Sequence, residues 1–273
     1  MTSNPLRPEM QRDLEFAVAA ARWAGERVLA LRASGRWKDT QLADIGDQAA
    51  DGLIQGLVHG RFPDDGILSE ETADTRARLD RSRVWIVDPL DGTREYSQER
   101  EDWGVHVALT IDGRCALGAV ALPARGKTIW GVCVDGFTRY GLEGTGQLAH
   151  GTSPTPQRLR IAVSRSHTPS WMPAFAQLLD AELVYSGSVG NKVGMLLLGE
   201  ADVYAHRKGL KEWDTCAPEC VARALGWSVS RLRGEEQRYN CVDPKNDEFL
   251  MCRPAWRDRV LSALHESGAT AGC

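Results

Sequence analysis

The chain has 273 residues, of which 42% are hydrophobic, and this is enough to bury a substantial core in one large domain or two packed halves. Its 33 Lys and Arg against 37 Asp and Glu give a net charge of −4, which lacks the basic excess expected of a nucleic-acid-binding surface. The apolar runs are too short to cross a bilayer, and Met1–Asp13 contains no apolar signal segment. We therefore expect a cytoplasmic protein whose partner is neither a nucleic acid nor a membrane.

Helices come first in the predicted order of elements. Apolar residues recur at helical spacing from Glu9 to Leu31, and a second helix is predicted over Asp47 to Val58. Extended segments follow, and Asp112-Gly113 between two of them is a typical hairpin turn. The predicted strands of this half are Ile67–Ser69, Val84–Val87, Val105–Thr110, Ala116–Leu122, Thr128–Val134 and Thr138–Leu142. This pattern indicates a sheet with helices on one side.

A stretch rich in Gly, Thr, Ser and Pro at Gly144–Gln157 predicts a boundary, so the chain divides into residues 1–150 and 151–273. Beyond it, strands and helices alternate, which favours an α/β layer. These elements are strand Arg160–Ser164, helix Ser170–Asp180, strand Glu182–Tyr185, helix Asn191–Leu198 and strand Ala201–Ala205. A further helix is predicted from Thr215 to Leu225, with Asp214 as its N-cap.

The seven cysteines are odd in number, widely spaced and without a CxxC pair. This spacing fits neither a zinc site nor a disulfide framework. We expect reduced thiols in or near the core.

The most informative segment runs from Trp85 to Thr93 with the sequence WIVDPLDGT. Its apolar strand delivers Asp88 and Asp91 into a turn, where Pro89 restricts the backbone and Gly92 permits close approach of a ligand. Two carboxylates held this near each other repel unless a positive charge lies between them. Hard oxygen ligands in such a turn suit Mg²⁺.

Two more acidic positions fit the same interpretation. Glu70 and Glu71 end a short strand, and Asp214 lies in a Trp-Asp-Thr sequence where a helix begins. An aspartate at a helix start is commonly an N-cap, but one of its oxygens can cap while the other binds a metal ion.

At these residues the chain resembles the inositol monophosphatase superfamily of Mg²⁺-dependent phosphatases. That family combines a Glu-Glu pair, Asp-Pro-Ile/Leu-Asp-Gly-Thr and a later Trp-Asp, and all three occur here in order. The resemblance implies an α/β fold of the sugar-phosphatase type, an α-β-α-β-α sandwich, in which the first part carries most metal ligands. It also implies a homodimer as the assembly to test. The implied metal ligands are Glu70, Asp88, the Leu90 carbonyl, Asp91 and Asp214.

The resemblance further implies that a threonine and an upstream aspartate activate the attacking water. The threonine matches Thr93, and the aspartate matches Asp47, although the lead-in Asp44-Ile45-Gly46 departs from the usual Thr-x-Ala. Asp51 is a rival for this role. We expect one Mg²⁺ at Glu70, Thr93 and Asp47 to lower the pKa of that water and a second at Asp88, Asp91 and Asp214 to stabilise the leaving oxygen. The backbone N–H groups of Gly92 and Thr93 should bind the phosphate.

Four local segments narrow the substrate. They are Asp91–Tyr96, Ser164–His167, the Gly-rich turn Gly187–Lys192, and Lys211–Glu219 with the sequence KEWDTCAPE. Together they resemble the bisphosphate nucleotidase branch, which includes the bacterial CysQ proteins and removes the 3'-phosphate from 3'-phosphoadenosine 5'-phosphate. The resemblance implies a nucleotide pocket in the second part of the chain, lined by Ser164, His167, Ser188 and Lys192. Lys192 would supply a cation for the 5'-phosphate.

Two alternatives to the bisphosphate nucleotidase hypothesis stay open. One is the same chemistry on another ester: inositol phosphate, fructose 1,6-bisphosphate or a nucleotide of a specialised biosynthetic pathway, because pockets on one fold differ by few residues. The other is a metal-dependent phosphate-binding protein without turnover.

Overall fold

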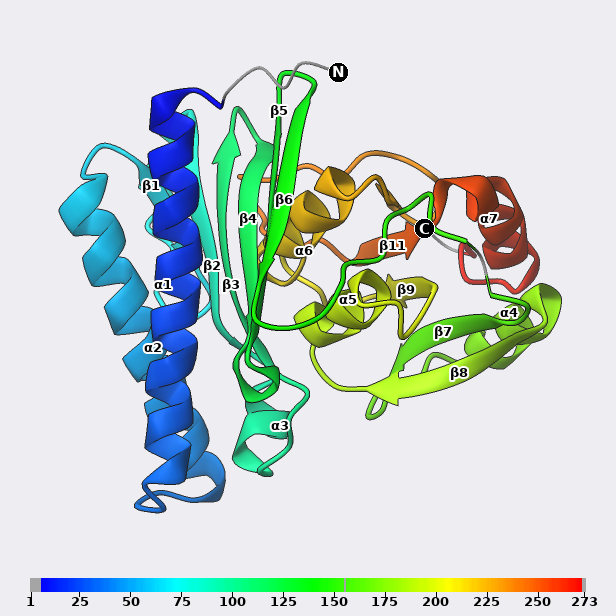
Figure 1. The fold of residues 1–273 in the computed structure, drawn as a ribbon, viewed down its shortest axis with the longest axis horizontal. Coiled ribbons are helices and arrows are strands. Elements are labelled where there is room, and N and C mark those ends of the chain that lie inside the picture. Colours follow the sequence, from blue (N-terminus) through cyan, green and yellow to red (C-terminus); the bar gives the residue numbers. More distant parts are fainter. Residues whose placement is uncertain (1–5, 155, 272–273) are drawn as a thin grey trace.

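Helices and sheets alternate in five layers in the computed structural model, which describes residues 6–154 and 156–271 (Figure 1). In order, the layers are α1 with α2, a six-stranded sheet, α5 with α6, a five-stranded sheet, and α4 with α7. The expected α-β-α-β-α sandwich is therefore confirmed. No helix within the described ranges is both long and apolar enough to cross a membrane.

The larger sheet has the strand order β1-β2-β3-β4-β5-β6, in which β1 pairs parallel with β2 and every later pair is antiparallel. The predicted Asp112-Gly113 turn joins β3 to β4, and both residues have the positive φ angles, 50° and 71°, that such a hairpin turn requires. All six predicted strands are present. Their bounds are β1 Gly66–Ser69, β2 Arg83–Asp91, β3 Gly104–Ile111, β4 Arg114–Leu122, β5 Lys127–Val134 and β6 Phe137–Glu143.

Two long helices, α1 (Pro8–Ala33) and α2 (Asp39–Arg61), cover one face of this sheet. The buried side of α1 follows the predicted helical spacing through Leu14, Val18 and Val28. These side chains pack against apolar residues of β2 to β5 and form a core of their own. The predicted start of the second helix at Asp47 is wrong, because the mostly polar segment from Asp39 already adopts helical structure and buries Leu42.

The smaller sheet has the order β10-β11-β9-β7-β8. Its β7 is parallel to both β8 and β9, as the alternating pattern predicted, whereas β11 is antiparallel to β9 and β10. The last two strands and the final helix are not among the predicted elements. The bounds are β7 Leu159–Ser164, β8 Ala181–Ser186, β9 Val203–Arg207, β10 Ser228–Ser230, β11 Glu248–Cys252, with helices α4 Met172–Leu179 and α7 Arg257–Glu266 on the outer face.

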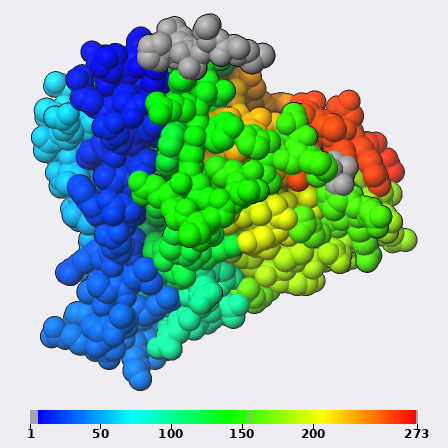
Figure 2. Space-filling model, viewed as in Figure 1, coloured from blue at the N-terminus to red at the C-terminus, as the bar shows by residue number. Residues whose placement is uncertain are grey.

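The middle layer, α5 (Val189–Leu197) and α6 (Glu212–Ala224), packs between the sheets. The largest core runs from the strands of one sheet through these helices to the strands of the other. The division at residue 150 separates the sheets, since one lies within 66–143 and the other within 159–252, but whether the parts behave as domains stays a prediction. In the space-filling view, β5, β6 and the segment that follows them cover the middle of the visible face (Figure 2).

Candidate active site

The end of β2 carries the first group of candidate residues. Asp88 and Asp91 are both buried, and the backbone N–H of Leu90 donates a 3.1 Å hydrogen bond to Oδ1 of Asp88. Gly92 follows in the left-handed region with a φ of 94°, and a Cβ there would lie 3.1 Å from Cβ of Ser188. The chain can therefore turn sharply from β2 into the short helix α3 (Thr93–Ser97) only with glycine at this position.

Asp91 joins β2 to the first turn of α5. Its Oδ1 accepts a 3.0 Å hydrogen bond from the N–H of Val189, and its Oδ2 accepts one of 2.6 Å from the N–H of Gly190. The hydroxyl of Ser188 donates to the same Oδ2 and also caps α5 by accepting from the N–H of Asn191. Asp91 thus lies at the positive end of the helix, where a negative charge is favourable.

Asp214 brings a third carboxylate to this position from α6. One oxygen from each of Asp88, Asp91 and Asp214 lies within 4.8 Å of the others. The expectation that Asp214 is the N-cap is wrong, because α6 begins at Glu212 with Lys211 as its N-cap. Asp214 is in the first turn, and its Oδ2 accepts a 2.6 Å hydrogen bond from the N–H of Lys211, which leaves the other oxygen free for a ligand.

The pKa values show that these carboxylates repel one another. Burial, followed by the charges of Glu70 and Asp91, raises the pKa of Asp88 well above its usual range. Burial and the charge of Asp91 raise the pKa of Asp214 to about 7. Burial alone would raise the pKa of Asp91 too, but His106 and Ser188 lower it to about 2. A bound cation would remove the repulsion, because it favours the charged form of each acid.

Glu70 comes to the same area from the end of β1, where its N–H donates to the carbonyl of Val87 at 3.3 Å. The pKa of Glu70 is raised to about 7, first by desolvation and then by Glu71 and Asp91. Parallel pairing of β1 with β2 explains why two acidic segments that are distant in sequence end side by side.

Thr93 and Asp47 meet beside the carboxylates. The hydroxyl of Thr93 lies 3.0 Å from the carbonyl oxygen of Leu90 and 3.5 Å from Oδ1 of Asp47 on α2. Asp47 is buried, and desolvation together with the charges of Glu71 and Glu70 raises its pKa to about 8. The Leu90 carbonyl, expected to face a metal ion, therefore lies next to the Thr93 hydroxyl.

Asp51 occupies a different position one helical turn later. Its Oδ1 accepts a 2.5 Å hydrogen bond from the hydroxyl of Ser69, and its Oδ2 accepts one of 2.9 Å from Thr72. Gln55 also donates to both oxygens. Asp51 thus fixes the chain on either side of the Glu70-Glu71 pair, whereas Asp47 is the aspartate that contacts Thr93.

His106 in β3 is a contributor that the sequence analysis missed. The strand register places it opposite Asp88, where its side chain is fully buried. Its Nδ1 lies 3.2 Å from the carbonyl oxygen of Trp213, and its Nε2 lies 3.2 Å from Oδ2 of Asp91. Burial alone would lower the pKa of His106, but the Asp91 carboxylate raises it above its usual value. The imidazole therefore connects β2 with the start of α6.

The four expected nucleotide-binding residues fall into two pairs. Ser188 and Lys192 lie at the start of α5, and the Lys192 ammonium donates to the carbonyls of Gly187, at 3.0 Å, and Ser188. Burial lowers the pKa of Lys192 to about 8. Ser164 and His167 lie after β7, where the Ser164 hydroxyl accepts a 3.2 Å hydrogen bond from the N–H of His167, whose side chain is exposed. Contact of these residues with a nucleotide stays a prediction.

A model of the inositol monophosphatase family matches residues 9–269. The chain belongs to the inositol monophosphatase family. It is 39% identical over 265 residues to a 3'-phosphoadenosine 5'-phosphate phosphatase of Mycobacterium leprae, covering 93% of this chain and 94% of the relative. A relative of the same name from Mycobacterium tuberculosis is 38% identical over 253 residues, with 89% of this chain and 90% of the relative covered.

Among solved structures, the fold is similar to CysQ from Bacteroides thetaiotaomicron, a bacterial member of the inositol monophosphatase family. The TM-score is 0.74 at 28% sequence identity, and the match covers 89% of this chain and 97% of the other. These similarities confirm the expected family, its layered fold and the class of enzyme, a metal-dependent phosphatase.

The side chains at the site could hold a metal ion, as expected for a member of this metal-dependent family. The donors are carboxylate and carbonyl oxygens, which hard divalent cations prefer to nitrogen or sulfur. Oδ1 of Asp91 accepts only from Val189 among the described contacts, so that oxygen retains a free lone pair for a ligand.

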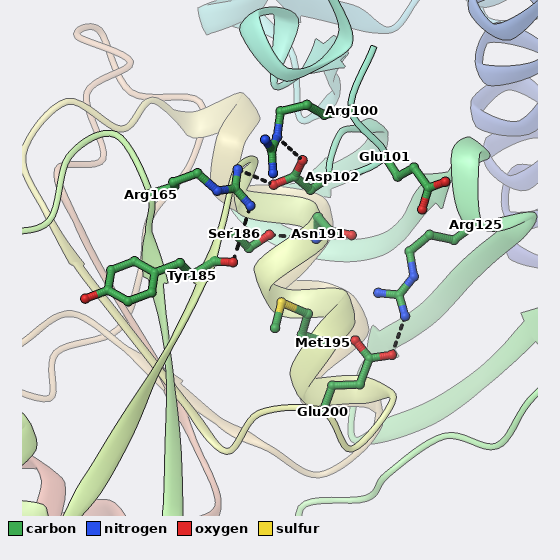
Figure 3. Close-up of a pocket in the computed structure, with 10 residues that line it drawn as sticks. All are labelled: Arg100, Glu101, Asp102, Arg125, Arg165, Tyr185, Ser186, Asn191, Met195 and Glu200. Atoms are coloured by element: carbon green, nitrogen blue, oxygen red, sulfur yellow. Dashed lines mark hydrogen bonds and ion pairs between the residues drawn. The ribbon is translucent and has the colours of Figure 1, made fainter. Parts of the chain in front are cut away.

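A cavity of about 610 Å³ lies against the loop that leads into α5 (Figure 3). Asp102 on its wall accepts from the N–H of Gly187 at 2.6 Å and pairs with Arg165 at 2.7 Å and with Arg100 at 3.0 Å. Asp102 thereby holds the loop that presents Ser188 to Asp91. Arg165 lies within the segment Ser164–His167, and its role could not be predicted because its partner Asp102 is distant in sequence.

Proposed function

We propose that this chain is a Mg²⁺-dependent 3'(2'),5'-bisphosphate nucleotidase that hydrolyses 3'-phosphoadenosine 5'-phosphate to AMP and phosphate. The observation that carries the proposal is the meeting of Asp88, Asp91 and Asp214 oxygens within 4.8 Å of one another, beside the Asp47–Thr93 pair. The substrate is supported by the mycobacterial relatives, which bear that activity in their names and cover about nine tenths of this chain or more.

Asp88, Asp91 and Asp214 would hold one Mg²⁺, and Glu70 would hold another beside Thr93 and Asp47, with the Leu90 carbonyl completing the ligand set. When bound, Mg²⁺ would offset negative charge on the phosphoryl oxygens and lower the pKa of a nearby water. Burial, and after it like-charge repulsion, raise the pKa of Asp88 and Asp214, so the protein's own acids are arranged at an energetic cost that a cation would relieve.

The residues beside the cluster would direct the water and the phosphate. Asp47 would accept the proton of the attacking water, because it lies beside Thr93, and a cation bound next to it would lower its raised pKa and keep the carboxylate charged. The Thr93 hydroxyl, within 3.5 Å of Asp47, would orient that water. The N–H groups of Gly92 and Thr93 would donate to the phosphate, and Ser164, His167, Ser188 and Lys192 would contact the nucleotide.

Lys192 would act partly by holding the loop that precedes α5 in place. Its ammonium binds the carbonyls of Gly187 and Ser188, so its positive charge is fixed at the start of α5. A phosphate bound near this turn would still experience that charge, because the buried setting screens it less than water does.

Phosphate release from a panel of esters tests the proposal. The purified chain would be assayed with 3'-phosphoadenosine 5'-phosphate, inositol 1-phosphate and fructose 1,6-bisphosphate, each with Mg²⁺ and with EDTA. We expect the highest kcat/KM for the bisphosphate nucleotide and no release in EDTA. A higher kcat/KM for inositol 1-phosphate or fructose 1,6-bisphosphate would identify that ester as the substrate in place of the bisphosphate nucleotide. Binding without release from any ester would leave a phosphate-binding protein.

A further inference from the structure

Three thiols gather at the end of the larger sheet that lies opposite Asp91. Cys115 is near the start of β4, Cys133 is near the end of β5, and Cys220 lies on α6 above both strands. Cys115 faces α6 because the β3–β4 pairing skips Ala116, and this irregularity turns Cys115 to the same face as Gly118. The thiols therefore form a cluster that is separate from the candidate active site.

Two glycines bring Cys220 close to the strands. A Cβ at Gly118 would lie 2.8 Å from Cα of Ala217, and a Cβ at Gly131 would lie 2.9 Å from Cα of Val221. With no side chains between them, α6 and the sheet are in backbone contact. The Cys133 thiol lies 3.5 Å from the carbonyl oxygen of Cys220, and the Cys220 thiol lies 3.6 Å from the carbonyl oxygen of Gly131 on β5.

A cavity of about 470 Å³ opens onto this cluster and is lined by Cys115, Cys133 and Arg223. Cys133 is half-buried, whereas Cys220 is fully buried behind it. A small oxidant can thus reach Cys133 before it reaches Cys220. Arg114, Asp135 and Arg223 are the charged residues that line this cavity. Behind them, Glu219 pairs with Arg223 at 3.0 Å and accepts a 2.5 Å hydrogen bond from the hydroxyl of Tyr239.

The charges around the cluster distinguish the cysteines. The hydrogen bond with Cys220, and then Arg223, lower the pKa of Cys133, although burial opposes this. Cys241 is the more exposed thiol, but desolvation and the Glu212 carboxylate raise its pKa. Thiolate is the reactive form of cysteine, so the lowered pKa favours Cys133 as the reactive thiol, whereas exposure favours Cys241.

We propose that Cys133 and Cys220 are a peroxide-responsive thiol pair, in which Cys133 is oxidised first and Cys220 closes a reversible disulfide with it. Reactive cysteines of this kind are accessible, carry thiolate character and have a second thiol nearby. Cys133 and Cys220 meet these conditions through the cavity, the Arg223 guanidinium and the direct contact across β5 and α6.

The chemistry balances with a hydroperoxide as the oxidant. The Cys133 thiolate attacks one peroxide oxygen, the O–O bond breaks, and hydroxide leaves as the sulfur becomes a sulfenic acid. The Cys220 sulfur then attacks the Cys133 sulfur, the S–O bond breaks, and the hydroxyl leaves as water with the thiol proton. The two sulfurs lose two electrons in total, and hydrogen peroxide is reduced to two molecules of water.

The test uses the full chain, reduced, separated from reductant and treated with hydrogen peroxide. Peptide mass spectrometry should find Cys133 joined to Cys220, and dithiothreitol should reverse the link. With dimedone present, the Cys220→Ala variant should accumulate the sulfenic acid adduct at Cys133. In the untreated wild type, iodoacetamide should label Cys133 at least about threefold faster than Cys241.

The iodoacetamide comparison needs no variant, so it decides the proposal even if Cys220→Ala fails to fold. Faster labelling of Cys241 than of Cys133 would overturn the assignment of Cys133 as the reactive thiol. A peroxide-induced disulfide between Cys133 and Cys115, or none at Cys133, would overturn the assignment of Cys220 as its partner. Phosphatase activity enters none of these measurements, so failure here is distinct from failure of the proposed function.

Discussion

The Oδ2 atom of Asp91 accepts a 2.6 Å hydrogen bond from the backbone N–H of Gly190, so the end of β2 is bonded directly to the first turn of α5. The Nε2 atom of His106 lies 3.2 Å from the same oxygen. The position of this carboxylate is therefore determined by the packing of a strand, a helix and an imidazole.

Gly190→Ala should disturb this arrangement. A Cβ at position 190 would lie 2.1 Å from Nε2 of His106 and 3.1 Å from Oδ2 of Asp91, so the helix or the imidazole has to move. We expect a loss of roughly 1–3 kcal/mol in the free energy of unfolding, measured by denaturant titration, together with weaker Mg²⁺ binding. Gly56→Ala is the control, because that helical position on α2 is exposed and has open space around it. Equal stability of the two variants would contradict this packing.

Asp88→Asn should bind Mg²⁺ weakly and lose at least about a hundredfold in kcat. The substitution preserves the shape of the side chain but removes one of the three carboxylates of the acidic cluster. Calorimetric titration with Mg²⁺ and steady-state kinetics measure the two effects. Asp64→Asn is the control, since that aspartate is exposed and lies outside the cluster. Near wild-type kcat in Asp88→Asn would remove Asp88 from the catalytic set.

Asp47→Asn and Asp51→Asn should show which of the two aspartates acts in catalysis and which stabilises the fold. Asp47 contacts Thr93, so its variant should lose kcat by at least about a hundredfold and keep most of its stability. Asp51 accepts hydrogen bonds from Ser69 and Thr72, so its variant should lose about 1–3 kcal/mol of folding free energy. Kinetics and chemical unfolding of both variants make the comparison. The reverse result would assign the water-activating role to Asp51.

The metal-free protein should lose stability as the pH rises from about 4 to about 8. Asp47, Glu70 and Asp214 have folded-state pKa values raised to about 8, 7 and 7. In this window the folded state binds more protons than the unfolded state, so stability falls with rising pH; below the unfolded pKa values the penalty is absent. Mg²⁺ should reduce the fall. Thermal unfolding across this range, with EDTA or Mg²⁺, measures it, and Asp47→Asn should show a smaller slope than the wild type in EDTA.

Local sequence was sufficient for much of the site. Asp88 and Asp91 could be predicted because a strand, a proline and a glycine stand within a few residues of them. The contribution of His106 could not, because it depends on the register that pairs β3 with β2. The early turns of α2 were missed because they are mostly polar, and β11 was missed because its run of four apolar residues after Glu248 has too little pattern to identify it.

The carboxylates of the acidic cluster arrive from β2 and α6, which are far apart in the chain and belong to different layers. A cation bound among them would therefore join β2, in the first part of the chain, to α6, in the second part. Cation binding and folding would then be linked, because a ligand that binds only the folded state stabilises that state. A fragment that ends before α6 begins would lack Asp214, and we expect such a fragment to be unable to retain the ion.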